Sequence, residues 1–305
     1  MILGAGASEP YGFPTGGELQ DAIIDGCQRE DSPISGHLSK LGFNSLAIQD
    51  FGNQLLRAKR TSVDRFLESR ETYLGIGTAA IVSALIPIED PTSVFKYRGR
   101  DGYRPEEDWY KYLWTRMDAP FEQFENNKLS IVTYNYDRSL EFYLYSALKH
   151  AYGKTDEECF QTLRRIPFIH LHGQLGTIFD GPADSNYRAY LPDTSYSDWK
   201  RIIPQIKIVH QVIPLENPQF LVARKKLFDA ERICFLGFGY DKTNIERLFG
   251  DLDLNNYFLD KELCGTALGF TIQEINRIIK TKLGKGFDAR DCGNLELLKQ
   301  TAVLL

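Results

Sequence analysis

The chain has 305 residues, of which 43% are hydrophobic, 12% aromatic and 25% charged. These fractions are typical of a folded globular protein and exclude a disordered, collagen-like or low-complexity chain. The net charge of −5, from 36 basic and 41 acidic side chains, gives no electrostatic indication that the protein binds nucleic acid. At about 150 residues per domain, this length favours one large or two modest domains.

The five cysteines and the apolar segments exclude further classes of protein. No two cysteines have C-x-x-C spacing, which excludes a four-cysteine zinc ribbon, and a disulfide scaffold is not expected in a chain of this length. The first residues lack the basic segment and long apolar run of a signal peptide. The longest apolar stretch, residues 78–88, is shorter than the roughly 20 residues of a membrane span. These features predict a cytoplasmic protein without a membrane partner.

The first predicted element is a short buried strand at residues 1–4, which a Gly/Ala/Ser-rich turn follows at residues 4–8. A core strand usually has about 5–6 residues, so we expect either a strand stub or a strand that lacks its first residues. A helix is predicted to begin near Pro14, because Thr15 and Glu18 have capping-box spacing.

Residues 26–125 are predicted to be helical, without a convincing buried strand. Thr61 and Asp64 again have capping-box spacing, and apolar residues recur after them at roughly helical intervals. Pro87 and Pro91 are expected to end that helical stretch. Residues 89–107, which are polar and broken by Pro, Gly and Asp, are predicted to form a loop, and another helix is predicted to begin at Trp109. We therefore expect a helical subdomain that is inserted into the rest of the fold.

Short apolar runs alternate with helical patterns from residue 129 onwards. Strands are predicted at residues 129–133, 166–171, 233–236 and 266–270, helices at residues 137–150, 217–230, 244–249 and 273–280, and an irregular stretch at residues 173–204. Because the strands are apolar throughout and helices follow them, the pattern indicates a parallel sheet with helices on both faces. The predicted fold class is α/β, with a Rossmann-like core at residues 1–25 and 126–305.

Residues that could carry chemistry lie where the predicted strands end, since ligands bind at the carboxyl edge of such a sheet. The first segment is Gly4-Ala5-Gly6-Ala7-Ser8, followed by Pro14-Thr15-Gly16. Small residues let the backbone approach a phosphate, and the following helix offers its N-terminal N–H groups. The segment is not the dehydrogenase fingerprint, because Glu9 stands where the third glycine belongs, and it is not a P-loop. A tight turn that binds nothing is the alternative.

Two further segments place polar residues or glycines after predicted strands. Asn135 and Asp137 follow the strand at residues 129–133, where the alternatives are a turn residue and a helix N-cap. Gly237 and Gly239 follow the strand at residues 233–236 and leave room beside its end, or merely permit a turn.

A pair of histidines, His170 and His172, lies at the end of the strand predicted at residues 166–171. Residues two apart on a strand point to the same face, so both imidazoles are expected to face the same way. Three interpretations stay open: hydrogen-bonded core histidines, a pair of metal ligands, and a catalytic imidazole at His172 next to Gly173.

The order of these four segments resembles the sirtuin-like (silent-information-regulator-like) family. Its members carry a GAG-S…GIP segment, a Gln-Asn-Ile-Asp segment, a His-Gly segment and a Gly-Thr-Ser-like segment, in that order, on a Rossmann-type sheet. The resemblance covers about residues 1–25 and 126–270, and residues 62–67 are also similar to bacterial sirtuin-like proteins. The chain departs from the deacylases of the family at Thr15-Gly16 and Tyr134, and it lacks their two C-x-x-C zinc pairs. It therefore looks like the bacterial, zinc-free branch.

The resemblance implies NAD+ as substrate and an NAD+ glycohydrolase that releases nicotinamide and ADP-ribose without a metal. The implied NAD-binding residues are Gly4, Ala5, Gly6, Ala7, Ser8, Pro14 and Thr15 at the pyrophosphate, Gly237 and Gly239 near the adenosine, and Asn135 and Asp137 near the nicotinamide ribose. His172 is expected to act as the catalytic base, and Asn135, the second catalytic residue, to position water or the ribose. Asp137 would hold the carboxamide, or merely cap its helix.

Other functions stay open at this point. A zinc-free protein deacylase or an ADP-ribosyltransferase would use the same NAD+ site, and a non-catalytic sensor would bind NAD+ or ADP-ribose without cleaving it. Metal-dependent hydrolysis through His170 and His172 would need a bound metal. Family analogy predicts a bacterial anti-phage defence effector that depletes NAD+. Because uncontrolled activity would drain the cell, we expect restraint by a homo-oligomer, a regulatory defence partner or a ligand.

Overall fold

The core of the protein is a six-stranded sheet in which every strand is parallel to its neighbours. The computed structural model describes residues 1–95, 98–99, 102–103, 107–181, 185–193, 195–208, 217–250, 260–284, 286–301 and 303–304. The strands of the sheet are β1 (Ile2–Leu3), β4 (Ile131–Thr133), β5 (Phe168–His170), β6 (Arg232–Leu236), β7 (Glu262–Thr266) and β8 (Asp288–Arg290). Their spatial order is β5-β4-β1-β6-β7-β8, the 3-2-1-4-5-6 order of dinucleotide-binding folds. The predicted α/β, Rossmann-like fold class is confirmed.

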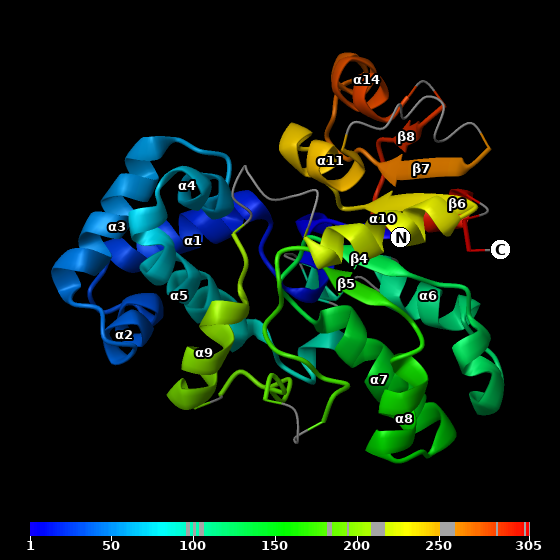
Figure 1. Ribbon diagram of the computed structural model, residues 1–305, viewed down its shortest axis with the longest axis horizontal. Helices are drawn as coiled ribbons and strands as arrows, with labels where there is room; N and C mark the ends of the chain where they lie inside the picture. The colour runs from blue at the N-terminus through cyan, green and yellow to red at the C-terminus, as the bar shows by residue number, and fades with distance from the viewer. Residues whose placement is uncertain are drawn as a thin grey trace.

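Both faces of the sheet are apolar, because successive residues of a strand point to opposite sides. Leu3 and Cys234 pack on one side, and Ile2 and Phe235 pack on the other. The first side is covered by α6 (Trp109–Arg116), α7 (Ser139–Tyr152), α8 (Asp156–Leu163) and α15 (Asn294–Gln300). The second side is covered by α10 (Pro218–Asp229), α11 (Lys242–Phe249), and the run of α13 (Ile272–Glu274), a π-helical segment (Ile275–Ile279) and α14 (Lys280–Leu283). Helices thus flank both faces, as Figure 1 shows.

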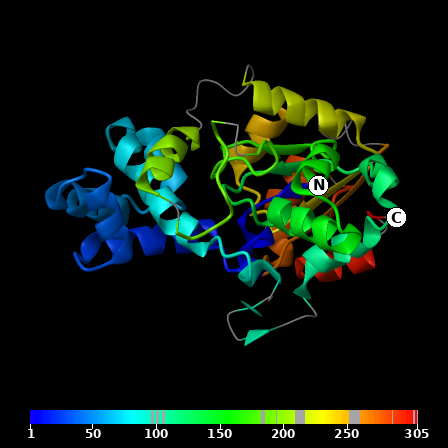
Figure 2. The same cartoon turned by 90° about the horizontal axis from the view of Figure 1, so that it is seen from below.

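A helical lobe lies beside the sheet (Figure 1, Figure 2). It contains α1 (Gly16–Gln28), α2 (Pro33–Lys40), α3 (Ser45–Ala58), α4 (Val63–Ser69), α5 (Leu74–Leu85) and α9 (Tyr196–Ile202). Among the described residues, one helical stretch, Glu71–Ile88, is long and apolar enough to cross a membrane by length and composition, and half of it is buried. Since α5 lies within that stretch and packs in the apolar cluster of the lobe, it has the surroundings of a core helix in a soluble α/β protein.

The packing divides the chain differently from the predicted insertion at residues 26–125. α6 lies within that range, but Trp109 and Tyr110 pack in the cluster on the first side of the sheet. The indole nitrogen of Trp109 also donates a hydrogen bond to the Ala7 carbonyl at 2.8 Å. α9 lies outside the range, yet Trp199 and Ile202 pack in the helical lobe. Each lobe therefore contains segments from both predicted regions, because apolar residues distant in sequence complete its core.

Local start signals explain where two helices of the lobe begin. The Glu18 carboxylate accepts hydrogen bonds from the Thr15 N–H and hydroxyl, both at 2.9 Å, so the predicted helix start at α1 is confirmed. The start predicted at Thr61 is one residue too early, because Ser62 Oγ caps α4 by accepting a hydrogen bond from the Arg65 N–H. The apolar run that follows forms two helices, α4 and α5, rather than one.

The C-terminal part of the sheet differs most from the sequence prediction. The strand predicted at residues 266–270 is wrong, because β7 ends at Thr266 and its Cys264 pairs with Cys234 of β6. β8, α8, α9 and α15 were not predicted, and a separate antiparallel pair, β2 (Arg98–Gly99) and β3 (Gly102–Tyr103), lies within residues 89–107, which were predicted to form a loop. β8 escaped notice because it is an edge strand whose residues are polar or half-buried.

One buried ion-pair cluster ties three distant segments together. The Glu89 carboxylate, just after α5, accepts hydrogen bonds from the guanidinium groups of Arg138 and Arg188, and all three side chains have at most 1% of their surface exposed. Arg138 also donates to the Arg188 carbonyl at 2.7 Å, and Arg188 donates to the Leu175 carbonyl at 2.9 Å. Burial lowers the pKa of both arginines to about 10, so both stay charged at neutral pH.

Replacing Glu89 is expected to destabilise the protein strongly. Glu89→Gln leaves two buried guanidinium groups without their shared carboxylate, so the free energy of unfolding should fall by about 3–5 kcal/mol. Urea unfolding followed by circular dichroism measures this change. Glu122→Gln is the matched control, since the Glu122 side chain is 76% exposed and 3.9 Å from Lys154, and it should change stability by less than about 0.5 kcal/mol. Equal effects of the two substitutions would contradict the role of Glu89.

Candidate functional site

A cavity of about 760 Å³ lies at the carboxyl ends of β1, β6, β7 and β8. Strand order reverses between β1 and β6, which is where doubly wound sheets bind their ligands. The cavity is lined by Ala5, Gly6, Glu9, Pro10, Thr15, Gly16, Glu107, Gly237, Phe238, Gly239, Thr266, Leu268, Phe270, Cys292, Gly293, Asn294, Leu295 and Glu296. Five of the predicted NAD-binding residues therefore line a single cavity.

Glycines after β1 and after β6 let the two loops pack directly against each other. A Cβ atom on Gly4 would lie 2.5 Å from the Gly237 carbonyl oxygen, and one on Gly237 would lie 2.0 Å from the Ala7 nitrogen. The N–H groups of Gly4 and Gly6 donate to the carbonyls of Leu236 and Gly237, both at 3.0 Å. These glycines are thus explained by loop packing, whatever the cavity binds.

The backbone of the first loop offers a phosphate fewer N–H groups than the sequence suggests. Besides Gly4 and Gly6, Ala7 donates to the Gly4 carbonyl and Ser8 to the Ala5 carbonyl. Four of the five N–H groups between Gly4 and Ser8 are therefore already engaged. The N-terminus of α1, where Thr15 and Gly16 line the cavity, is a further source of N–H groups and of a positive dipole end. The start of α15 also lines the cavity, at Gly293 and Asn294.

The charged side chains that line the cavity are acidic in the described part of the chain: Glu9, Glu107 and Glu296. Polar side chains there also support the loops, since Thr266 Oγ1 accepts a hydrogen bond from the Gly237 N–H and Asn294 donates to the Gly6 carbonyl. Carboxylates favour ligand hydroxyl groups, such as those of a ribose, over phosphate. The cavity therefore suits a sugar or nucleoside better than a densely charged group.

Asn135 and Asp137 lie outside this cavity, in a buried polar cluster on the β4 side of β1. The Asn135 amide donates hydrogen bonds to the Gly4 carbonyl at 2.9 Å and to Ser8 Oγ at 3.0 Å. Asp137 Oδ1 accepts hydrogen bonds from the Ser139 N–H and hydroxyl at the start of α7, although the N-cap position of this helix is Arg138 and not Asp137. Burial raises the pKa of Asp137. The space between these side chains is only about 10 Å³, roughly the size of one water.

His170 is a hydrogen-bonded core histidine. Its Nδ1 is 2.9 Å from the Asn135 carbonyl oxygen and its Nε2 is 2.7 Å from Glu141 Oε1. Burial favours the neutral imidazole, but the Glu141 carboxylate outweighs it and raises the pKa of His170. Both ring nitrogens are engaged, and no group of three or more His, Cys, Asp or Glu side chains that could hold a metal occurs among the described residues. The metal-pair interpretation thus has no geometric support.

His172 has different surroundings, so the prediction that both imidazoles face the same way is wrong. β5 ends at His170, and the chain beyond it turns. The His172 ring packs edge-on against Tyr134, with ring centres 5.3 Å apart, and near Tyr136 at 6.2 Å. Burial and the charge of Arg247 lower the pKa of His172. Its Nε2 is buried and has no hydrogen-bond partner in the described structure, so a neutral imidazole with an unused nitrogen results.

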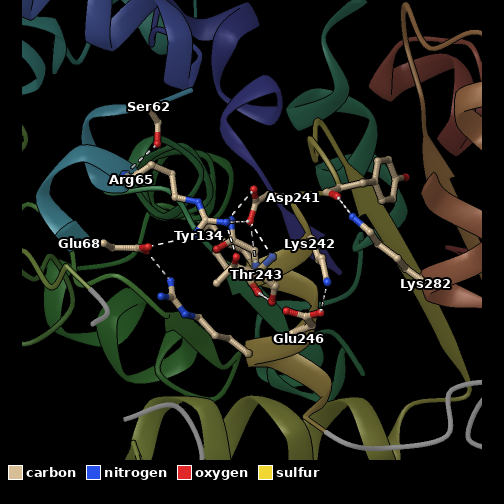
Figure 3. Close-up of polar contacts among 12 residues, drawn as sticks. Ser62, Arg65, Glu68, Tyr134, Asp241, Lys242, Thr243, Glu246 and Lys282 are labelled. Carbon is tan, nitrogen blue, oxygen red and sulfur yellow. Dashed lines mark hydrogen bonds and ion pairs between the residues drawn. The ribbon is translucent and has the colours of Figure 1, made fainter. Parts of the chain in front are cut away.

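Charged residues of α4 meet charged residues at the start of α11 and within it, and Figure 3 shows Arg65, Glu68 and Asp241 among them. The charges of Asp64, Glu68, Asp241 and Arg247 act on His172. Arg65 Nη2 lies 3.0 Å from Asp241 Oδ1, and Glu68 accepts hydrogen bonds from both Arg65 and Arg247, at 2.9 and 2.6 Å. Asp64 accepts a hydrogen bond from the Tyr136 hydroxyl. Residues 62–67 were singled out by the resemblance, but nothing in the sequence pointed to Glu68, Asp241 or Arg247.

Comparisons with known proteins add no family to this geometry: no family model, curated protein or solved structure matches the chain. The structure places Ser8, Asn135 and Asp137 together, Gly237 and Gly239 at the cavity, and His172 in a third environment. Asn135 links its own polar cluster to the loop that borders the cavity, because its amide donates a hydrogen bond to the carbonyl of Gly4 in the loop after β1. The sirtuin-like resemblance stays a prediction that rests on the sequence motifs.

The two glycines after β6 are expected to respond differently to substitution. Gly237→Ala forces a Cβ into the backbone of the first loop at a positive φ of 56°, whereas a Cβ on Gly239 meets no atom within 4 Å. Gly237→Ala should lower the free energy of unfolding by about 1–3 kcal/mol, and Gly239→Ala should leave it nearly unchanged. Thermal and urea unfolding of both variants test this. Equal stability of the two would show that the loops do not pack as described.

Proposed function

We propose that the protein is an NAD+ glycohydrolase that cleaves NAD+ to nicotinamide and ADP-ribose. The observation that carries this proposal is the 760 Å³ cavity at the reversal of strand order, whose first loop is hydrogen-bonded to Asn135. The resemblance of the four segments to sirtuin-like proteins supports the same substrate. In this proposal the adenosine part of NAD+ occupies the cavity, and its ribose hydroxyls meet the carboxylates that line it.

The proposed reaction breaks the bond between C1′ of the ribose and the nicotinamide nitrogen. The bonding electron pair returns to the nicotinamide ring, which leaves as a neutral molecule, and C1′ gains oxocarbenium character. A water oxygen forms the new bond to C1′, and its proton passes to Nε2 of His172. A buried, neutral imidazole with an unused nitrogen suits this role. Asn135 acts as the residue that positions the ribose or the water.

Nicotinamide does not fit the space beside Asn135 and Asp137, because about 10 Å³ holds only one water. Catalysis therefore requires a side chain that lines this space, such as Tyr110 or Ser8, to move. A closed site is consistent with an enzyme restrained until a ligand, a partner or self-association opens it. On the resemblance alone, we propose that this enzyme acts in the cytoplasm as an anti-phage effector that depletes NAD+.

The same closed space favours a second candidate, a sensor that binds NAD+ or ADP-ribose without cleaving it. The open cavity would take the adenosine part, and the packed cluster around Asp137 would stay shut. Recovery of intact NAD+ after prolonged incubation with a protein that binds it tightly distinguishes this candidate from the hydrolase.

Incubation with NAD+, followed by chromatography of the products, tests the hydrolase directly. The wild-type protein should release nicotinamide and ADP-ribose in equal amounts. His172→Ala and Asn135→Ala should each reduce the rate roughly 10²- to 10⁴-fold, because they remove the base and the residue that positions its target. His150→Ala is the matched control, since His150 is exposed on α7 and, in the described part of the chain, hydrogen-bonds to Ser146 of its own helix.

Thermal unfolding of these variants must show that they remain folded. Nicotinamide release at the full rate in both His172→Ala and Asn135→Ala would overturn the site assignment. Transfer of ADP-ribose to protein, or NAD-dependent loss of an acyl group from lysine, would replace hydrolysis by one of the other reactions considered.

The pH dependence of the rate should report the lowered pKa of His172. The base must be unprotonated, and burial keeps the imidazole neutral to a lower pH than usual. The value of kcat/KM is therefore expected to stay level as the pH falls through about 6.5, the ordinary imidazole pKa, and to decline only below it. A decline centred above about 6.5 would exclude His172 as the base.

A further inference from the structure

A second cavity, of about 640 Å³, lies at the opposite edge of the sheet, where β1, β4 and β6 begin. Met1, Ser130 and Arg232 line it near the starts of these strands, whereas the candidate NAD+ cavity lies at the carboxyl edge. The two cavities share no lining residue among those that the structure describes. None of the predicted site residues lines the second cavity, so the proposed function does not use it.

The walls of the second cavity come from both sides of the sheet and are largely apolar. Leu113 and Met117 lie at the end of α6, on the first side, and Leu227 lies on α10, on the second side. Leu129 and Ile233, next to the starts of β4 and β6, add apolar surface between the two helices. Sites for small molecules commonly have volumes of roughly 300–1,000 Å³ and mostly apolar walls. The cavity is therefore suited to a small molecule that carries an apolar ring.

Positively charged side chains accompany this apolar lining. Five basic residues line the cavity: Arg116, Lys128, Arg165, Lys226 and Arg232. Two acidic residues, Asp229 and Glu231, line it as well, so the described lining carries a net charge of +3. The chain as a whole carries a net charge of −5. Such a local excess of positive charge attracts anions.

Three of the five cations can interact with a ligand without giving up an ion pair. Arg165 and Arg232 already have carboxylates 3.6 and 3.2 Å away, on residues that do not line the cavity. Arg116, Lys128 and Lys226 have no carboxylate within ion-pair distance in the described part of the chain. They belong to α6, to the segment before β4 and to α10, respectively. Cations from three separate segments match a ligand with several negative charges, such as a chain of phosphates.

We propose that this second cavity binds a nucleoside triphosphate. The phosphates lie against Arg116, Lys128 and Lys226, and the base packs against the apolar side chains of α6 and α10. An inorganic phosphate would leave the apolar walls without a contact, and an uncharged ring would leave the cations without an anion. The site is independent of the proposed function, because it lies at the other edge of the sheet.

Calorimetry with ATP and GTP tests the proposal, with ADP-ribose present in excess to fill the NAD+ cavity if the proposed function holds. Both nucleotides should bind, and the affinity should fall as the NaCl concentration is raised, because salt screens the interaction of phosphates with exposed cations. Inorganic tripolyphosphate and adenosine should each bind at least roughly 10-fold more weakly than ATP, since each makes only one of the two kinds of contact.

Substitutions of lysine locate the ATP site. Lys128→Gln combined with Lys226→Gln removes two of the three cations and should weaken ATP binding roughly 10-fold. Lys111→Gln combined with Lys225→Gln is the matched control, because both lysines are exposed and neither lines the cavity. The control should leave the affinity for ATP within about 2-fold. Glu231→Gln removes a negative charge from the lining and should tighten ATP binding, a gain that a merely structural effect would not produce.

Several outcomes would overturn the proposal. They are the absence of ATP and GTP binding, equal weakening of ATP binding in the two double variants, and binding of hexaglutamate that is tighter than that of ATP, which would indicate an acidic peptide as the ligand. Tripolyphosphate that binds as tightly as ATP would overturn the role of the base. ATP binding that depends on Lys128 and Lys226, in a protein that leaves NAD+ intact, contradicts the hydrolase and supports this site.

Discussion

The shared ion pair of Glu89 with Arg138 and Arg188 is the constraint on which the candidate site depends. In an apolar interior, two guanidinium groups are tolerated only where a carboxylate and several carbonyls satisfy them, and here one carboxylate serves both. Arg138 directly follows Asp137, so the cluster determines where the polar segment after β4 lies. It also anchors the end of the helical lobe and the long loop after β5 to that same point.

Around this anchor the site is divided into an open side and a closed side. The loops after β6, β7 and β8 surround a cavity large enough for a nucleotide, whereas the residues after β4 enclose a space for one water. Asn135 connects the two sides, because its amide bonds to the loop after β1 and its carbonyl meets His170. A movement of the loop after β1 would therefore change the shape of the cavity and of the closed space together.

The helical lobe contributes chemistry as well as packing. Contacts between α4 and α11 combine a half-exposed ion pair, Arg65 with Asp241, and a buried one, Glu68 with Arg247. Solvent and salt screen the half-exposed pair, so it adds little to the stability of the contact. The contribution of the buried pair to stability depends on the geometry of its hydrogen bonds. The lobe is thus attached to the sheet at the point where His172 keeps an unused nitrogen.

The sequence by itself determined the fold class, because apolar runs followed by helical patterns allow only a parallel sheet covered on both faces. It also located the loop after β1 and the residues Asn135 and Asp137, since strand ends carry signals that are local in the chain. Only the tertiary structure decided that both ring nitrogens of His170 are engaged, whereas Nε2 of His172 has no partner in the described part of the chain. Glu141 and Arg247, which act on the two imidazoles, come from distant helices. The tertiary structure likewise decided the position of β7 and the membership of the lobes, since sheet register and core packing join residues that no local pattern connects.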